Sequence, residues 1–445
     1  MEQNLTQGSV WKSVVRFSLP FLLSYFLQTF YGMADLYVIG QFCGVESTTA
    51  VSIGSQVMHM LTVMIVGLAM GVVVTIGRAV GAGDKRQLLQ SIGNTVILFM
   101  GLSLILTALL LLSTRGIVSL VSTPEEAKTG TLSYLTICFL GIPFITAYNM
   151  ISAVFRGMGD SKTPMYLIGA ACISNILLDY LLIGAFGLGP AGAALGTTLS
   201  QAFSVMLALT GLLKRKLFLK REHFRPDRKT LADILQVGVP VAFQDGFIQI
   251  AFLVITAFAN LRGLEDAAAV GVVEKLIGIL FLVPSSMLQT VSALSAQNIG
   301  AGKYGRARSV LGYACMITVG WGILAAAAMH IWSEPVIGMF LSSPGAVEMG
   351  CQYMKGYVWD CMLAGIHFSF SGFFCACGLS MLSFLHNAIS IVCVRIPLSY
   401  AAARFFKDSL FPMGLASPAG SALSAGICLW VYIRLLRKQK EKNLQ

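Results

Sequence analysis

The stretch that indicates whether this chain folds in water or in a membrane is TTAVSIGSQVMHMLTVMIVGLAMGVVV, at residues 48–74. The stretch runs for 27 residues without one Asp, Glu, Lys or Arg. A helix of about 20 apolar residues crosses the ~30 Å hydrocarbon core of a bilayer, whereas a helix on a soluble domain needs a polar face. The stretch therefore predicts a membrane-spanning helix.

The composition of the whole chain agrees with a membrane protein. Of 445 residues, 56% are apolar and 11% are charged, whereas a soluble protein carries about 25% charged residues. So little charge cannot give a chain of this length a polar surface. The same figures exclude intrinsic disorder and a disulfide scaffold. The one tight Cys pair, Cys375 and Cys377, has no second pair at metal-ligand spacing, so no structural metal is expected.

Twelve apolar windows of membrane-spanning length follow one another along the chain. They predict an all-α polytopic membrane protein with twelve transmembrane helices. These helices are expected at residues 14–40, 48–74, 88–113, 130–153, 165–187, 190–213, 234–260, 268–293, 309–332, 350–374, 380–404 and 418–436.

The Lys and Arg residues indicate which side of the membrane each loop faces. With the N-terminus inside, 23 of them lie in the inner segments and 5 in the outer loops. Cytoplasmic loops are enriched in Lys and Arg, so we expect a multi-pass protein of the cytoplasmic (inner) membrane with both termini in the cytoplasm. The loop at 214–233 holds eight of them beside three acids. We expect this loop to face anionic lipid headgroups and not nucleic acid.

The chain contains one unit twice. Val80-Gly81-Ala82-Gly83 returns as Ile299-Gly300-Ala301-Gly302, an offset of 219 residues, and the same offset joins Gly159 to Gly378. Two halves of six helices each have the same orientation, and such lobes around a central cavity are the architecture of a transporter. The predicted parts are an N-terminal six-helix lobe at 1–213, a basic cytoplasmic linker at 214–233 and a C-terminal six-helix lobe at 234–445.

Motifs for nucleotide binding or catalysis do not occur. Gly300-Ala301-Gly302-Lys303 is followed by Tyr304 and lacks the upstream glycine of a phosphate-binding loop. Neither H-E-x-x-H nor G-x-S-x-G is present. We expect a monomeric transporter that is not an enzyme and needs no cofactor besides a coupling ion.

Several motifs resemble the multidrug and toxic compound extrusion (MATE) family. They are the run FYGMADLYVIG at residues 30–40, the two Gly-Ala-Gly loops and the run RGMGDSKTP at residues 156–164. The resemblance covers nearly the whole chain. Its bacterial multidrug efflux branch consists of cation-coupled antiporters. The resemblance therefore implies ion transport, antibiotic resistance and the export of amphiphilic, mostly cationic compounds by alternating access in exchange for H⁺ or Na⁺.

Two acids at bilayer depth are the strongest candidates for a coupling site, because a charge there costs ~2.5–3.5 kcal/mol or more. Asp35 shares a helix face with Gln28 and Tyr31, and Asp179 follows Asn175 by one turn. No basic residue of the first half lies at bilayer depth to neutralise them. Unpaired carboxylates with amide and phenol neighbours suit reversible binding of a cation or proton. The alternative is a protonated Asp that only links helices by a hydrogen bond.

The resemblance extends this site. In the MATE family an Asp of the first helix and an Asn…Asp pair of the fifth form the cation site of the N-terminal lobe. They correspond to Asp35, Asn175 and Asp179 here, which would also be the place for Na⁺. The resemblance implies that Tyr134 and Thr197 line this site, together with Gln28 and Tyr31 from the face of Asp35.

The second half carries different charges at bilayer depth. Asp360 and His367 lie on one stripe of the tenth helix, and Arg395 on the eleventh is the expected partner of Asp360. Such a buried pair either fixes helix packing or takes part in substrate binding or coupling, and both readings stay open. Glu274 precedes Lys275, so one of the two is expected to face the cavity while the other extends outward. The substrate cavity is thus expected to include Glu274, Asp360, His367 and Arg395.

A related flippase of a lipid-linked precursor or another lipid is the alternative function. It would need a positively charged cavity for a pyrophosphate. Only Lys275, Lys355 and Arg395 are bases at bilayer depth, against five acids. This balance favours the antiporter.

Overall fold

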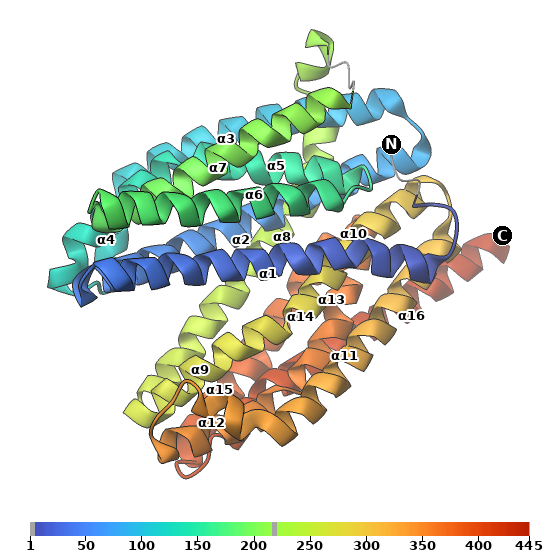
Figure 1. Cartoon of the computed structure of the whole chain (residues 1–445). Helices are drawn as coiled ribbons and strands as arrows, with labels where there is room; N and C mark the ends of the chain where they lie inside the picture. Colours follow the sequence, from blue (N-terminus) through green and yellow to red (C-terminus); the bar gives the residue numbers. More distant parts are fainter. Residues whose placement is uncertain (1–4, 216–219, 445) are drawn as a thin grey trace. The chain divides into compact units, whose positions relative to one another are not determined.

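The computed structural model describes residues 5–215 and 220–444, and these residues form helices and no strands. The predicted all-α fold is confirmed. Figure 1 labels most of these helices. The first half contains α1 (Val10–Phe42), α2 (Val45–Ala82), α3 (Lys85–Leu120), α4 (Glu125–Leu140), α5 (Ile142–Gly157), α6 (Lys162–Asp179), the π-helix η1 (Tyr180–Ala185) and α7 (Gly189–Lys214).

The second half follows the short 3₁₀ helix η2 (Arg221–Phe224). It contains α8 (Arg228–Asn260), α9 (Leu264–Leu280), α10 (Leu282–Gly300), α11 (Tyr304–Gly338), α12 (Pro344–Tyr357), α13 (Asp360–Cys377), α14 (Ser380–Ser390), the π-helix η3 (Ile391–Arg395), α15 (Ile396–Phe405) and α16 (Phe411–Leu444).

These helices account for the predicted spans. Within the described residues, eleven are long and apolar enough to cross a membrane, some of them made of two consecutive helices. The twelfth is the pair α4 and α5, bent by 48° at the break between them. A Pro in the first turn of α5 lacks the N–H that would continue the hydrogen-bond ladder from α4.

The internal repeat is visible in the backbone. Gly83 ends α2 with φ +70° and Gly302 follows α10 with φ +72°. Gly159 and Gly378, at φ +87° and +78°, follow α5 and α13. Glycine adopts this left-handed conformation at no steric cost, and it is a common way to end a helix. The repeated glycines therefore mark two equivalent helix ends in each half.

Both halves contain a π-helix in the fifth predicted span. η1 begins directly after Asp179, and η3 ends at Arg395. π-Helical turns insert an extra residue into the helical ladder and are frequent at functional sites. In each half this irregular turn adjoins a charged side chain that the sequence singles out.

Contacts divide the chain into two compact units, which we describe separately. The first unit comprises Met1–Gly8, Val15–Ala242 and Ala296–Lys303. The second unit comprises Ser9–Val14, Phe243–Ser295 and Tyr304–Gln445. The lobe boundaries predicted at 213 and 234 stay a prediction, because this grouping follows contacts and not the sequence repeat. Residues 216–219 of the predicted linker lie outside the described residues.

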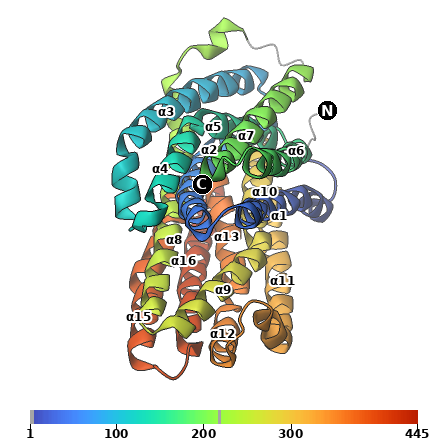
Figure 2. The ribbon, with the colours of Figure 1, turned by 60° about the vertical axis from the view of Figure 1, so that its left-hand side comes forward.

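Each unit has a buried apolar core. In the first unit α3, α4, α5 and α7 pack side by side (Figure 2), and the core includes Ile39, Leu135 and Ala193. The core of the second unit includes Val273 and Tyr357. Large apolar side chains elsewhere lie exposed, among them Leu104, Leu112, Ile331, Trp332 and Trp430. Exposed apolar side chains on the outside of long helices are typical of helices that face lipid.

Candidate functional site

Three helices of the first unit bring the predicted coupling residues together. Asp35 lies on α1, Asn175 and Asp179 lie on α6, and Thr197 lies on α7. The side chains of Asp35, Asn175 and Asp179 are 6%, 1% and 0% exposed. Thr197 Oγ1 donates a hydrogen bond of 3.4 Å to Asp35 Oδ2, and the two carboxylates are close enough to interact directly. The four residues form one cluster, whose role in coupling stays a prediction.

This cluster contains five buried polar atoms that have no hydrogen-bond partner among the described residues. They are Asp35 Oδ1, Asp179 Oδ1 and Oδ2, and Asn175 Oδ1 and Nδ2. Proteins pair more than nine-tenths of such groups, because leaving one unpaired costs ~1–3 kcal/mol. In the described part of the chain, neither carboxylate forms an ion pair with Lys or Arg. The cluster therefore offers oxygens to a ligand that brings positive charge.

Gly196 on α7 allows α7 to lie directly against the cluster. A Cβ atom at this position would lie 2.2 Å from Asp179 Oδ1 and 3.5 Å from Asn175 Nδ2. The first distance is far below van der Waals contact, so Asp179 occupies this place only because residue 196 is glycine. The sequence analysis did not predict this role of Gly196. The signal that could have indicated it is its position directly before Thr197, a residue expected to line the site.

Two tyrosines lie near Asp35, as the sequence predicts. Tyr134 on α4 is 3% exposed, and the phenol groups of Tyr134 and of Tyr31 on α1 lie close enough to Asp35 to interact electrostatically with its carboxylate. Gln28 lies seven residues before Asp35 and is half-buried. Within the described residues it makes no hydrogen bond to the cluster, so its place in the lining stays a prediction.

Asp360 and Arg395 form the ion pair that the sequence predicts in the second half. Arg395 Nη2 lies 2.8 Å from Asp360 Oδ2, and the two residues are 9% and 0% exposed. Arg395 also donates from Nε to Ser417 Oγ at 2.9 Å and from Nη2 to Tyr357 Oη at 3.3 Å. Among the described residues, Asp360 Oδ1 has no hydrogen-bond partner. The protein thus uses only one of the two carboxylate oxygens.

Two buried histidines extend this polar region. His367 Nε2 lies 3.3 Å from Ser421 Oγ, while His367 Nδ1 has no partner within the described residues. His386 contacts Ser371 Oγ at 2.9 Å and Ser424 Oγ at 3.2 Å. The centres of the two imidazole rings are 5.5 Å apart.

Sequence reasoning identified His367 but missed His386. The signal lies in the helical spacing of polar residues on α14. His386 and Asn387 follow Ser383 by three and four residues, Ser390 follows them by four and three, and all four are buried.

Glu274 lies on α9 and is half-buried. Its Oε2 accepts a hydrogen bond of 3.1 Å from Thr256 Oγ1, and its Oε1 has no partner in the described part of the chain. Lys275 is exposed. The two neighbours therefore differ in burial, as their adjacent positions on a helix predict.

Asp360, His367 and Arg395 line one pocket of the second unit, whose free volume is about 50 Å³. Asn387, Ser390 and Ser421 complete the polar part of its wall, and three phenylalanines form an aromatic part. Glu274 is not a lining residue of this pocket. The structure therefore joins three of the four charged or titratable residues predicted for the second half in one cavity.

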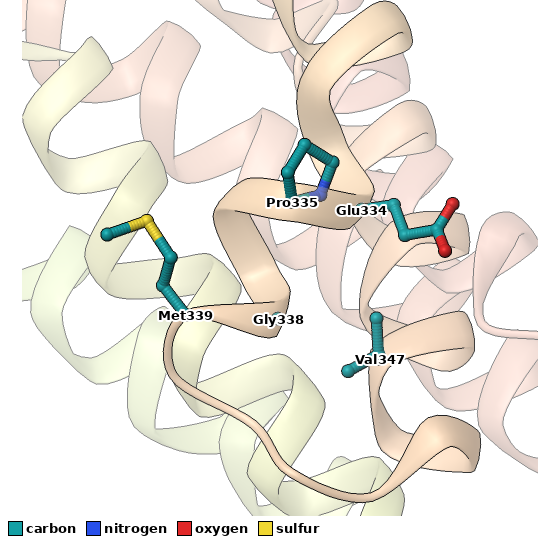
Figure 3. Close-up of a pocket in the computed structure, with 5 residues that line it drawn as sticks. All are labelled: Glu334, Pro335, Gly338, Met339 and Val347. Carbon is teal, nitrogen blue, oxygen red and sulfur yellow. The ribbon is translucent and has the colours of Figure 1, made fainter.

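Another hollow lies where α11 ends and α12 begins (Figure 3). Its volume is about 480 Å³, and it is lined by Glu334, Pro335, Gly338, Met339 and Val347. Its one carboxylate belongs to an exposed side chain that points away from Met339. Exposed single charges bind ligands weakly, so this hollow is a poor candidate for the functional site.

Comparison with known proteins gives matches over both halves. The model of the MatE family matches residues 20–181 and 240–401. The probable multidrug resistance protein YpnP of Bacillus subtilis is 30% identical over 97% of this chain and 96% of that protein. YoeA of the same organism, also named a probable multidrug resistance protein, is 26% identical over 99% of this chain and 96% of its own length.

A solved structure has the same fold. It is described as the outward-facing conformation of a multidrug resistance MATE family transporter. Its TM-score is 0.92 at 21% identity, and the match covers 99% of each chain. The predicted fold class is therefore confirmed by a protein of known structure.

Proposed function

Because this chain belongs to the MatE family, and is therefore a multi-pass membrane transporter, we propose that it exports amphiphilic, chiefly cationic drugs or toxic compounds in exchange for H⁺ or Na⁺. The family predicted from the motifs is thus confirmed. The names of its relatives as multidrug resistance proteins support the substrate class. The bias of Lys and Arg towards one set of loops supports an inner-membrane location with cytoplasmic termini.

The buried carboxylates of the first unit are the observation that carries the proposal. Asp35 and Asp179 lie together without a basic partner and with unpaired oxygens. We propose that the ion and the substrate compete for these oxygens. Ion binding from outside then releases the substrate, and ion release inside exposes the carboxylates again. Such exclusive occupancy makes the transporter an exchanger that works by alternating access.

The cluster suits either coupling ion by chemistry, because oxygen ligands bind hard cations. Sodium would use the unpaired oxygens of Asp35, Asn175 and Asp179 together. A proton needs only one of the two carboxylates. Some members of the MATE family couple to sodium through a glutamate in the first span of the second half. This chain has no glutamate at 234–260, so we favour the proton.

Efflux from proteoliposomes tests this proposal. The purified chain is reconstituted, loaded with an ethidium-like cation and given a pH gradient without sodium, and then a sodium gradient without a pH gradient. We expect efflux driven by the pH gradient, and Asp35→Asn should reduce its initial rate by at least about 100-fold, the order of loss for a removed charge-stabilising group.

Asp408→Asn is the matched control, because it makes the same chemical change on an exposed loop. It should transport like the wild type. Undiminished efflux in Asp35→Asn would refute the coupling role of the cluster. If neither gradient moved any cation, the antiporter would be wrong and lipid flipping would become the leading function.

A further inference from the structure

The ends of α2 and α10, where the repeated Gly-Ala-Gly turns begin, pack against each other within the first unit. A Cβ atom on Gly81 would lie 1.9 Å from the carbonyl oxygen of Gln297, and a Cβ atom on Gly300 would lie 2.1 Å from the carbonyl oxygen of Arg78. Both distances are far below van der Waals contact. The two helix ends therefore meet backbone to backbone, at what we call the glycine junction, only because both residues are glycines.

The contact at the glycine junction is reciprocal. Gly81 and Gly300 are equivalent residues of the internal repeat, and the same offset of 219 residues joins Arg78 to Gln297. The glycine of each copy thus touches the carbonyl group of the other copy. A pattern in which residue i contacts j while the equivalent of i contacts the equivalent of j is the signature of a two-fold axis. The junction therefore lies where the local two-fold axis of the repeat passes between the ends of α2 and α10.

Hydrogen bonds hold the end of α10 at the glycine junction. Gln297 Nε2 donates to the carbonyl oxygen of Gly157, the last residue of α5, at 2.9 Å, and Lys303 Nζ donates to the carbonyl oxygen of Thr6 at 2.9 Å. Gln297 is 0% exposed, yet its Oε1 has no hydrogen-bond partner within the described residues. Burying such an atom unpaired is unfavourable, so water that reaches Gln297 when the junction parts offsets part of the cost of opening.

The glycine junction lies at the end of the spans for which the sequence predicts a cytoplasmic location. Four basic residues follow the two turns, namely Lys85, Arg86, Lys303 and Arg306, and Lys and Arg are enriched in cytoplasmic loops. In a transporter built from two repeats, the substrate site lies between the repeats and becomes accessible when one repeat moves against the other. A contact on the axis of the repeat, at the cytoplasmic end, therefore closes the path to that site from the cytoplasm.

We propose that the glycine junction is the cytoplasmic gate of this transporter, shut in this structure, and that it opens when the end of α10 leaves α2. Its opening accompanies closure of the path at the opposite ends of the same spans, which begin at Val45 and Leu264. The role of the gate in export rests on the proposed exchange by alternating access. The opposite movement of the two ends does not depend on the coupling ion or on the substrate.

Hydrogen exchange of the full chain in lipid nanodiscs, followed by mass spectrometry, tests the proposal with Gly81→Ala. The added Cβ meets a backbone oxygen, which no change of rotamer can move, so the junction must part. Overpacking of this kind shifts an equilibrium at least about tenfold. We expect exchange at residues 78–84 and 297–303 to accelerate by at least about tenfold and exchange in the first turns of α2 and α9 to slow. Amides of a first turn lack intrahelical partners and therefore report access of water.

A junction that only packs two helices together predicts a different pattern. Gly81→Ala would then accelerate exchange at residues 78–84 and 297–303 without slowing it in the first turns of α2 and α9, and this result overturns the proposal. Unchanged exchange at both ends overturns it as well. If Gly81→Ala does not fold, Gln297→Ala removes the hydrogen bond to Gly157 and should give the same opposite changes, of about fivefold at the cytoplasmic ends. Changes of one sign at both ends of the spans in that variant would also refute the gate.

Gly305→Ala is the matched control, because an added Cβ in the first turn of α11 meets no atom within 4 Å. It should exchange like the wild type at both ends of the spans. Efflux from proteoliposomes separates this proposal from the antiport proposal. If no gradient drives efflux by the wild type while Gly81→Ala shows the opposite changes, the antiport proposal fails alone. If a gradient drives wild-type efflux but Gly81→Ala changes exchange only at the cytoplasmic ends, the gate fails alone.

Discussion

Replacing Gly196 by alanine tests whether the position of Asp179 matters for transport. The added Cβ would lie 2.2 Å from Asp179 Oδ1, whereas ordinary contacts begin near 3.4 Å. The shortfall of about 1.2 Å falls on the end of a short, fully buried side chain. We expect the carboxylate to rotate away from α7, because this rotation costs less than separating two packed helices.

The expected effect on stability is small and the effect on transport is large. Overpacking a buried site costs about 1–3 kcal/mol, and alanine recovers up to about 1 kcal/mol of helix propensity relative to glycine. A misplacement of about 1 Å in a reacting group costs up to about 100-fold in rate. Gly196→Ala should therefore lower the unfolding temperature by a few degrees while efflux driven by a pH gradient falls at least about tenfold.

Gly101→Ala is the matched control, since an added Cβ on that helical glycine meets no atom within 4 Å. It should retain efflux and unfold at the same or a higher temperature. Both variants are compared in the proteoliposome assay and by thermal unfolding. Full efflux in Gly196→Ala at an unchanged pH dependence would refute the argument that Asp179 must lie against α7.

Three further predictions concern the ends of helices. Asp160 caps the start of α6 with two backbone hydrogen bonds of 3.0 Å and pairs with Arg215, so Asp160→Ala should cost about 1–2 kcal/mol in thermal unfolding; an unchanged midpoint would contradict this. Hydrogen bonds from Thr230 lower the pKa of Asp227. The ionised Asp227 carboxylate therefore stabilises the fold above its unfolded-state pKa of about 3.9, and this stabilisation is lost as the pH falls through its lower folded-state pKa. Hydrogen exchange in the first turn of α8 should thus be faster in Asp227→Ala than in the wild type at neutral pH, and the difference should shrink towards about pH 3; a difference that stays constant would exclude this carboxylate as the cause. Arg262 donates to the backbone carbonyls of the loop after α15 at 2.8 and 2.9 Å and pairs with an acid on α9. Arg262→Ala should therefore lower the free energy of unfolding by about 2 kcal/mol, and Arg262→Lys should recover only part of this loss, because lysine lacks the planar guanidinium group. Full recovery by lysine would show that charge alone matters there.

Hydropathy and repetition in the sequence determined the fold class. Apolar windows had to become helices, because a bilayer offers no water to satisfy backbone polar groups. The repeated glycines predicted equivalent ends in the two halves, and Gly83 and Gly302 adopt the same left-handed conformation. The motifs identified the family, and the cost of burying charge identified Asp35, Asp179 and the Asp360–Arg395 pair.

The packing of the helices against one another determines which of these residues meet and which of their atoms stay unpaired. Periodicity places a side chain on a helix face but does not reveal the atoms opposite that face. Hence Gly196 and His386 were missed, although one touches Asp179 and the other lies beside His367. The sequence pattern also did not predict the two π-helices, η1 directly after Asp179 and η3 ending at Arg395. An inserted residue changes the helical register without changing the composition of the segment. The composition of the second pocket, with both charges and an aromatic wall, follows from the packing of helices distant in sequence, which no single segment encodes.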